Sequence, residues 1–135
     1  MHRAEIPAGN GIGDARSLAR LFAACIGEVD GVRLLQAPTL AGATEPQSEG
    51  SDLVGLESNR FGLGFFLVFP RLPFGGPRSF GHDGLGGSVV LADPDSGLAF
   101  AYTTDTVPEN PGADPRAWRL LEAVRAGIGQ VSGGT

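Results

Sequence analysis

The chain has 135 residues, of which 41% are apolar, and its 15 carboxylates against 10 basic side chains give a formal net charge of −5. All the basic residues are arginines, scattered without a basic stripe, so no nucleic-acid partner is expected. The single Cys25 excludes an internal disulfide, and no apolar run approaches the length of about 20 residues that spans a membrane. With no signal-peptide pattern at its start, the sequence predicts one soluble, cytoplasmic domain over residues 1–135.

The first predicted helix covers residues 15–26. Asp14 precedes it and is a suitable N-cap. Apolar side chains then recur at the spacing of one buried helix face. They are Leu18, Leu21, Phe22, Cys25 and Ile26. A short helical turn is possible further on, from Pro38.

The middle of the chain predicts a long loop followed by an antiparallel sheet. Residues 44–59 are polar and weakly patterned, which indicates a surface loop. Residues 61–69, FGLGFFLVF, are rich in the aromatic and β-branched residues typical of a strand. Residues 88–92 and 98–104 form two further strand-like runs. The DPDSG between them has the composition of a tight turn, so these runs are predicted to form a β-hairpin.

The second predicted helix begins near Pro115. Asp114 followed by this proline is typical of a helix start, because proline is favoured at the first helical position. An apolar stripe follows, made of Trp118, Leu121, Val124 and Ile128. Residues 130–135 are expected to fray. The order of elements predicts an α+β fold, with a strand and a β-hairpin between an N-terminal and a C-terminal helix.

Five segments, taken in chain order, resemble the C-terminal part of the serine β-lactamase-related hydrolases, in the branch of class C β-lactamases and similar esterases. They are GNGIGDARSLARLFAACIG, VRLLQAPTLAGATEPQ, SNRFGLGFFLVFP, FGHDGLGGSVVLADPDSGLAFAYTTD and DPRAWRLLEAVRAG. The resemblance covers nearly the whole chain. Its most specific part is His-x-Gly followed by Gly-Gly-Ser on a strand that enters a hairpin. It implies the C-terminal part of a β-lactamase/transpeptidase-like α/β domain.

The resemblance also implies a site built from three motifs. They are Ser-x-x-Lys with the nucleophile, Tyr-x-Asn or Ser-x-Asn, and a third motif that is Lys-Thr-Gly in β-lactamases and often His-x-Gly in esterase-like relatives. His82, Asp83 and Gly84 match the third motif. His82 and Gly84 would then contact substrate, and the backbone N–H of Leu85 would be one of two oxyanion-hole donors, whose partner donor belongs to the nucleophile.

Two of the three motifs are missing from this sequence. A chain without lysine cannot contain Ser-x-x-Lys, and neither Tyr102-Thr103-Thr104 nor Ser58-Asn59 matches the second motif. We therefore expect a partial domain that is inactive alone and needs no cofactor. An upstream segment would complete it for acyl-serine hydrolysis of a small ester or amide. Esters are favoured over β-lactams because a neutral histidine lacks the fixed charge of lysine.

The same residues are also consistent with less specific roles. His82 in a glycine-rich turn is also consistent with a structural hydrogen-bonded group, and Asp83 with a solvated or capping carboxylate. Ser88 lacks the Gly-x-Ser-x-Gly setting of a nucleophile. GNGIG lacks the preceding strand of a dinucleotide-binding loop and has no third glycine at the offset that such a loop requires. No metal site is expected, because His2 and His82 are far apart and Cys25 lies on an apolar helix face.

Two alternative functions remain open at this point. The chain is also consistent with a free-standing, non-catalytic module that binds a partner through its sheet edge or its long loop. A weak intrinsic hydrolysis centred on His82 is the other alternative, and it would be lost in His82→Ala. The sequence specifies neither the substrate nor the oligomeric state.

Overall fold

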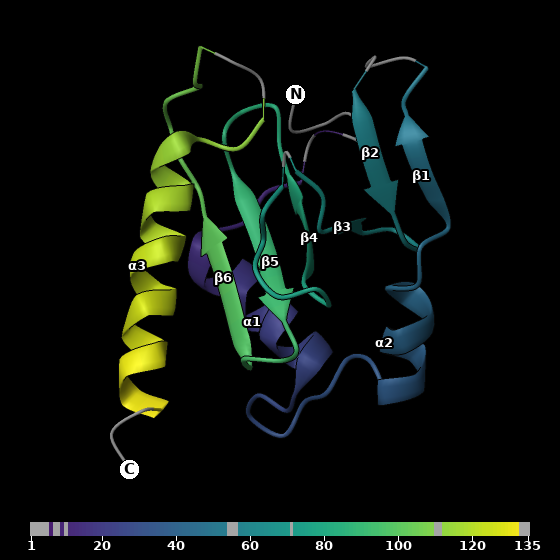
Figure 1. The fold of residues 1–135 in the computed structure, drawn as a ribbon. Coiled ribbons are helices and arrows are strands. Elements are labelled where there is room, and N and C mark those ends of the chain that lie inside the picture. The colour runs from purple at the N-terminus through teal and green to yellow at the C-terminus, as the bar shows by residue number, and fades with distance from the viewer. Residues whose placement is uncertain are drawn as a thin grey trace.

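The computed structural model describes Ile6, Gly9 and residues 11–53, 57–70, 72–109 and 112–132, with side chains described as far as residue 129. Three helices and six strands follow one another in the part of the chain that it describes (Figure 1). They are α1 (Ala15–Ile26), α2 (Ala37–Ala43), β1 (Ser48–Ser51), β2 (Ser58–Phe61), β3 (Phe66–Leu67), β4 (Phe80–Asp83), β5 (Val89–Asp93), β6 (Leu98–Tyr102) and α3 (Pro115–Ser132).

The six strands form one antiparallel sheet in the order β1-β2-β3-β4-β5-β6, so each strand pairs with the next one along the chain. At the end of β4, Asp83 pairs with Val89, and at the end of β5, Asp93 pairs with Leu98. The turns after β4 and after β5 therefore lie at opposite ends of the central strands. The α+β class predicted from the sequence is confirmed.

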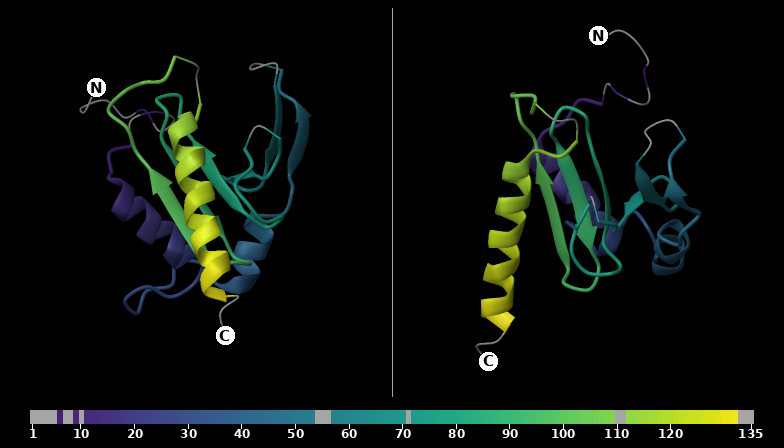
Figure 2. Two further views of the ribbon diagram at one scale, coloured as in Figure 1. Left: turned by 60° about the vertical axis from the view of Figure 1, so that its left-hand side comes forward. Right: turned by 45° about the horizontal axis from the view of Figure 1, so that its top comes forward.

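Helices cover both faces of the central strands, as the views in Figures 1 and 2 show. Alternation along β5 explains this arrangement, since successive side chains of a strand point to opposite faces. Val89 and Leu91 belong to one apolar cluster with Leu121 of α3. Ala92 belongs to a second cluster with Phe22 of α1. The result is a three-layer arrangement rather than a sheet with one covered face.

The predicted loop over residues 44–59 was wrong, because β1 and the first half of β2 lie within it. All four residues of β1 are exposed, and β2 is at most half-buried. A strand is recognised in a sequence by alternating apolar side chains, and an outer strand with no buried face lacks this pattern. The sheet therefore has more strands than the three that were expected.

The single strand predicted for residues 61–69 is interrupted. β2 ends at Phe61, β3 contains only Phe66 and Leu67, and a turn closed by the bond from Gly62 N–H to Phe65 O (2.9 Å) joins them. A Cβ on Gly62 would lie 2.2 Å from the carbonyl oxygen of Ala43, so the backbone approaches α2 too closely for any side chain. The interspersed glycines thus mark a turn and not a strand interior.

The predictions of the two long helices and of the β-hairpin agree with the structure. The helix over residues 15–26 is confirmed as α1, and α3 begins at Pro115 as predicted. The β-hairpin is confirmed as β5 and β6. Of the tail predicted to fray, residues 130–132 form the end of α3, while residues 133–135 lie outside the described residues. Among the helices described, none is both long and apolar enough to cross a membrane.

Candidate functional site

The third-motif residues occupy the end of β4 and the turn that follows it. Gly87 N–H donates to Gly84 O (2.9 Å), and Gly84 N–H donates to Ser88 O (2.8 Å). Gly87 has a φ of 96°, which matches hairpin loops in which a turn is followed by one residue in the left-handed region. Backbone hydrogen bonds and one glycine conformation therefore define this turn.

Leu85 takes the second position of the turn and leaves its backbone N–H available. Its side chain is 78% exposed. Within the described part of the chain, no oxygen accepts a hydrogen bond from Leu85 N–H. Gly84 and Gly86 flank it without side chains, and a Cβ on Gly84 would meet only Ser88 O, at 3.8 Å. The end of β4 thus presents an open backbone donor to an approaching ligand.

His82 lies beside this turn with an exposed side chain. Its Nδ1 is 2.6 Å from the carbonyl oxygen of Asp83. A carbonyl oxygen only accepts, so Nδ1 donates and, in the neutral ring, Nε2 keeps the lone pair. The imidazole also packs against the Phe66 ring, with the ring centroids 4.6 Å apart. His82 is therefore oriented by its own strand and its neighbour, with Nε2 left for other contacts.

Asp83 faces the other way and is buried, at 7% exposure. Its Oδ2 accepts a hydrogen bond of 3.1 Å from the backbone N–H of Ala113, which lies just before α3. Of the two roles predicted for Asp83, a solvated or a capping carboxylate, the solvated one was wrong. The alternation along β4 that turns His82 outward sends Asp83 toward the side of the sheet that α3 covers.

A hollow of about 170 Å³ lies beside His82. It is lined by Leu18 of α1, by His82, Asp83, Gly84 and Ser88, and by Val89 and Val90 of β5. In the part of the chain described, no imidazole or carboxylate hydrogen-bonds to Ser88 Oγ, so Ser88 has no base. The hollow can hold part of an uncharged substrate but does not by itself activate a nucleophile.

Neither a metal cluster nor a reactive thiol adds chemistry to this region. No group of three or more His, Cys, Asp or Glu side chains that could hold a metal ion occurs among the described residues. His2 lies outside them. Cys25 is buried on α1, and burial raises the pKa of its thiol, which disfavours the nucleophilic thiolate.

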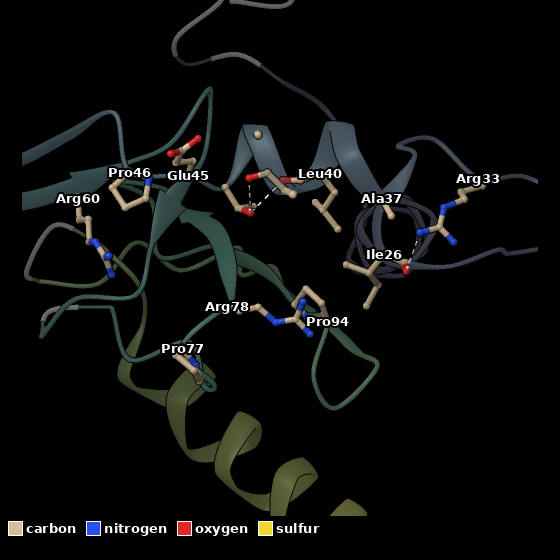
Figure 3. A pocket seen from close by; sticks show the side chains of 13 residues that line it. Ile26, Arg33, Ala37, Leu40, Glu45, Pro46, Arg60, Pro77, Arg78 and Pro94 are labelled. Atoms are coloured by element: carbon tan, nitrogen blue, oxygen red, sulfur yellow. Dashed lines mark hydrogen bonds between the residues drawn. The ribbon is translucent and has the colours of Figure 1, made fainter.

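A wider hollow, of about 720 Å³, lies at the opposite end of the central strands (Figure 3). Three of its lining residues are arginines, but they do not converge on one point in Figure 3. Arg33 donates to the carbonyl oxygen of Leu35, and Arg60 Nε lies 3.3 Å from Glu49 Oε2. Arg78 pairs with Asp95. Arg60 and Arg78 thus lie beside carboxylates, whereas the hydrogen bonds of Arg33 go to backbone carbonyl oxygens.

Sequence reasoning missed the contacts between the turn and the segment just before α3. Asp114 N–H donates to Gly87 O (3.0 Å), next to the bond from Ala113 to Asp83. Asp114 was expected only as a helix cap, and its Oδ1 does accept from Arg116 N–H (2.8 Å). The partners in these contacts are about 30 positions apart in sequence, and no local pattern indicates them.

Comparisons with known proteins agree on one family. The sequence profile described as Beta-lactamase matches residues 1–125. The esterase/beta-lactamase LipL of Mycobacterium tuberculosis is 40% identical over 101 residues, which are 73% of this chain and 23% of that protein.

Three solved structures resemble the whole arrangement. A penicillin-binding protein homolog from Caulobacter crescentus is 38% identical with a TM-score of 0.85, and a family VIII carboxylesterase is 33% identical with a TM-score of 0.86. Both matches cover 93% of this chain and 34% of that protein. EstA from Arthrobacter nitroguajacolicus Rue61a is 35% identical with a TM-score of 0.78, over 88% of this chain and 33% of EstA. The chain therefore spans 23% of LipL and about a third of each of the three proteins with solved structures.

Proposed function

The chain belongs to the beta-lactamase family, and from this we propose that it forms one wall of the acyl-transfer site of an esterase-like serine hydrolase. The reaction is hydrolysis of an ester through an acyl-serine intermediate. The nucleophile and its base come from outside these 135 residues, since the sequence has no lysine and therefore no Ser-x-x-Lys. Relatives described as esterases, among them LipL and a family VIII carboxylesterase, support the esterase direction.

One observation carries this proposal: the open backbone N–H of Leu85 at the end of β4. Acyl transfer from an ester passes through a tetrahedral intermediate whose negative oxygen needs preorganised N–H donors about 3 Å away. The N–H of Leu85 is fixed in a hydrogen-bonded turn and has no acceptor within the described residues. It therefore needs no rearrangement when the oxyanion forms. The second donor is the N–H of the nucleophile itself.

His82 and Gly84 serve this site as substrate contacts. Gly84 leaves the strand end free of a side chain, so the substrate can approach the backbone next to Leu85. His82 keeps Nε2 for the substrate because Nδ1 is engaged by the carbonyl oxygen of Asp83. Its part is orientation of the bound ester, since no nucleophile of this chain is paired with it.

A neutral ester is the substrate that this wall fits best. The hollow beside His82 is lined mainly by apolar or uncharged groups, and no arginine is among the described residues that line it. Asp83, its one charged residue, is engaged by Ala113. A substrate carboxylate of the β-lactam type would find no positive partner there.

The proposed location of the protein is the cytoplasm, as the sequence predicts.

The test uses the complete product of the native gene, assayed with p-nitrophenyl butyrate and labelled with a fluorophosphonate that reacts with activated serines. We expect ester turnover, and mass spectrometry should locate the labelled serine outside residues 1–135. The 135-residue chain alone serves as the control and should neither turn over the ester nor be labelled. Absence of both signals in the complete product, or a label on Ser88, would contradict the proposal.

A further inference from the structure

Asp83 is a buried carboxylate that the proposed chemistry does not use directly. It follows His82 and precedes the turn, yet its side chain reaches across to the segment before α3. The bond from Ala113 N–H to Asp83 Oδ2 joins residues 30 positions apart. A hydrogen bond to a charged acceptor in a buried place is among the stronger ones in a protein. Asp83 therefore ties the end of β4 to a distant part of the chain.

The same segment holds the turn by a second contact. Asp114 N–H donates to Gly87 O (3.0 Å). Gly87 is also packed tightly, since a Cβ there would lie 2.9 Å from Pro108 Cδ and 3.1 Å from Thr104 Cγ2. The connection between β6 and α3 thus supports the turn that carries Leu85. Two adjacent N–H groups of this connection donate to it, Ala113 N–H to the Asp83 side chain and Asp114 N–H to the Gly87 carbonyl.

The turn has little support of its own. Its two internal hydrogen bonds are both backbone bonds, from Gly84 N–H and from Gly87 N–H. Three glycines, at 84, 86 and 87, give its backbone more freedom than other residues would allow. If the Leu85 N–H is to point in one fixed direction, contacts from outside this glycine-rich turn must hold its backbone in place.

We propose that Asp83 is a positioning residue, whose carboxylate anchors the segment before α3 against the turn and thereby sets the direction of the Leu85 N–H. The catalytic consequence rests on the proposed function, whereas the anchoring itself does not. The carboxylate of Asp83 is buried and turned toward the segment before α3. It acts through Ala113, Asp114 and the Gly87 carbonyl on the turn.

The first experiment is hydrogen–deuterium exchange, read by mass spectrometry on peptides of the complete gene product. Asp83→Ala should speed the exchange of amides in 84–88 and 112–114 by roughly tenfold or more, because both segments lose their anchor. Asp83→Asn should keep exchange near that of the parent, because its amide oxygen can accept the same bond. Asp93→Ala is the matched control, a second buried aspartate at the other end of the strands, and should affect 93–97 instead.

The second experiment measures ester hydrolysis by the same variants. Asp83→Ala should lower kcat by roughly tenfold with little change in KM, because a misdirected oxyanion donor weakens the transition state more than the ground state. Asp83→Asn should restore most of kcat. Asp93→Ala should lower the melting temperature without changing kcat of the folded enzyme.

The outcomes separate the two proposals. Unchanged exchange at 84–88 in Asp83→Ala would overturn the anchoring, whatever the activity. Faster exchange with an unchanged kcat would overturn the positioning role while leaving the anchor in place. If the parent hydrolyses no ester and carries no labelled serine, the proposed function fails, and the exchange data still decide whether Asp83 anchors the turn.

Discussion

The two turns at opposite ends of β5 are held in different ways. The turn after β5 has hydrogen bonds to its own side chains, and Arg125 of α3 also approaches Asp93 Oδ2, at 4.0 Å. Buried Asp93 accepts from Asp95 N–H (3.1 Å) and from Ser96 Oγ–H (2.8 Å). The turn after β4 has only backbone bonds within it and is held by the segment before α3. The turn after β4 thus leaves the Leu85 N–H without an acceptor among the described residues, and its support comes from the segment before α3.

The largest effect is expected where the open donor is removed. Leu85→Pro deletes the N–H, yet proline is favoured at the second position of such a turn, so the fold should tolerate it. We expect kcat for ester hydrolysis in the complete gene product to fall about 100- to 1,000-fold. Leu85→Ala keeps the N–H and should stay near the parent. If the Leu85→Pro enzyme kept its full kcat, the open N–H in the turn after β4 would have no role in catalysis.

Loss of the side chain that organises the other turn should cost stability and leave chemistry alone. Asp93→Ala leaves Asp95 N–H and the Ser96 hydroxyl without their buried acceptor. We expect the free energy of unfolding to fall by about 2–3 kcal/mol in urea denaturation. A change well below 1 kcal/mol would show that the turn after β5 is not held by Asp93.

The same residue predicts a pH dependence. Burial acts to raise the pKa of Asp93, but hydrogen bonds from Ser96 and from the backbones of Asp95 and Gly76, together with the charge of Arg125, outweigh it and hold the pKa below its ordinary value of 3.8. Because the pKa is lower in the folded state, this stabilisation is complete above the ordinary value and is lost as the pH falls through the folded pKa. Unfolding measured across the acid range should therefore be less pH-dependent in Asp93→Asn than in the parent.

Two glycines provide an intermediate test of the same comparison. Gly87 and Gly97 both have positive φ, 96° and 67°. A Cβ on Gly87 would press on Pro108 and Thr104, whereas a Cβ on Gly97 would meet nothing within 4 Å. Gly97→Ala should cost about 1 kcal/mol from backbone strain, and Gly87→Ala about 2 kcal/mol or more, as measured by thermal unfolding. Equal losses of stability in the two variants would contradict the tight packing of Gly87 in the turn after β4.

The smallest effect on stability is expected from an exposed ion pair at the turn after β5. Arg78 pairs with Asp95 there, but both side chains are largely exposed. Exposed ion pairs contribute little because water and salt screen them. Arg78→Ala should leave the melting temperature unchanged within error. A clear decrease would mean that this pair, and not Asp93 alone, organises the turn.

The elements that were predicted correctly are those whose signals are local. Asp14 caps α1, with its carboxylate accepting from Ser17 N–H at 2.9 Å, and Pro115 begins α3. His82 lies in β4, a strand that the residue pattern did not predict. β1 was missed because an exposed strand has no apolar alternation, and its pairing with β2 becomes visible only in the sheet.

The sequence by itself determined the helices, the hairpin of β5 and β6, the absence of a Ser-x-x-Lys nucleophile, and the place of His82, Gly84 and Leu85 in the chain. These depend on residue types within a few positions of one another. Only the tertiary structure decided that Asp83 is buried and that Ala113 donates to it. That contact forms when α3 packs on the sheet, because the apolar stripe of the helix determines which distant segment reaches the turn.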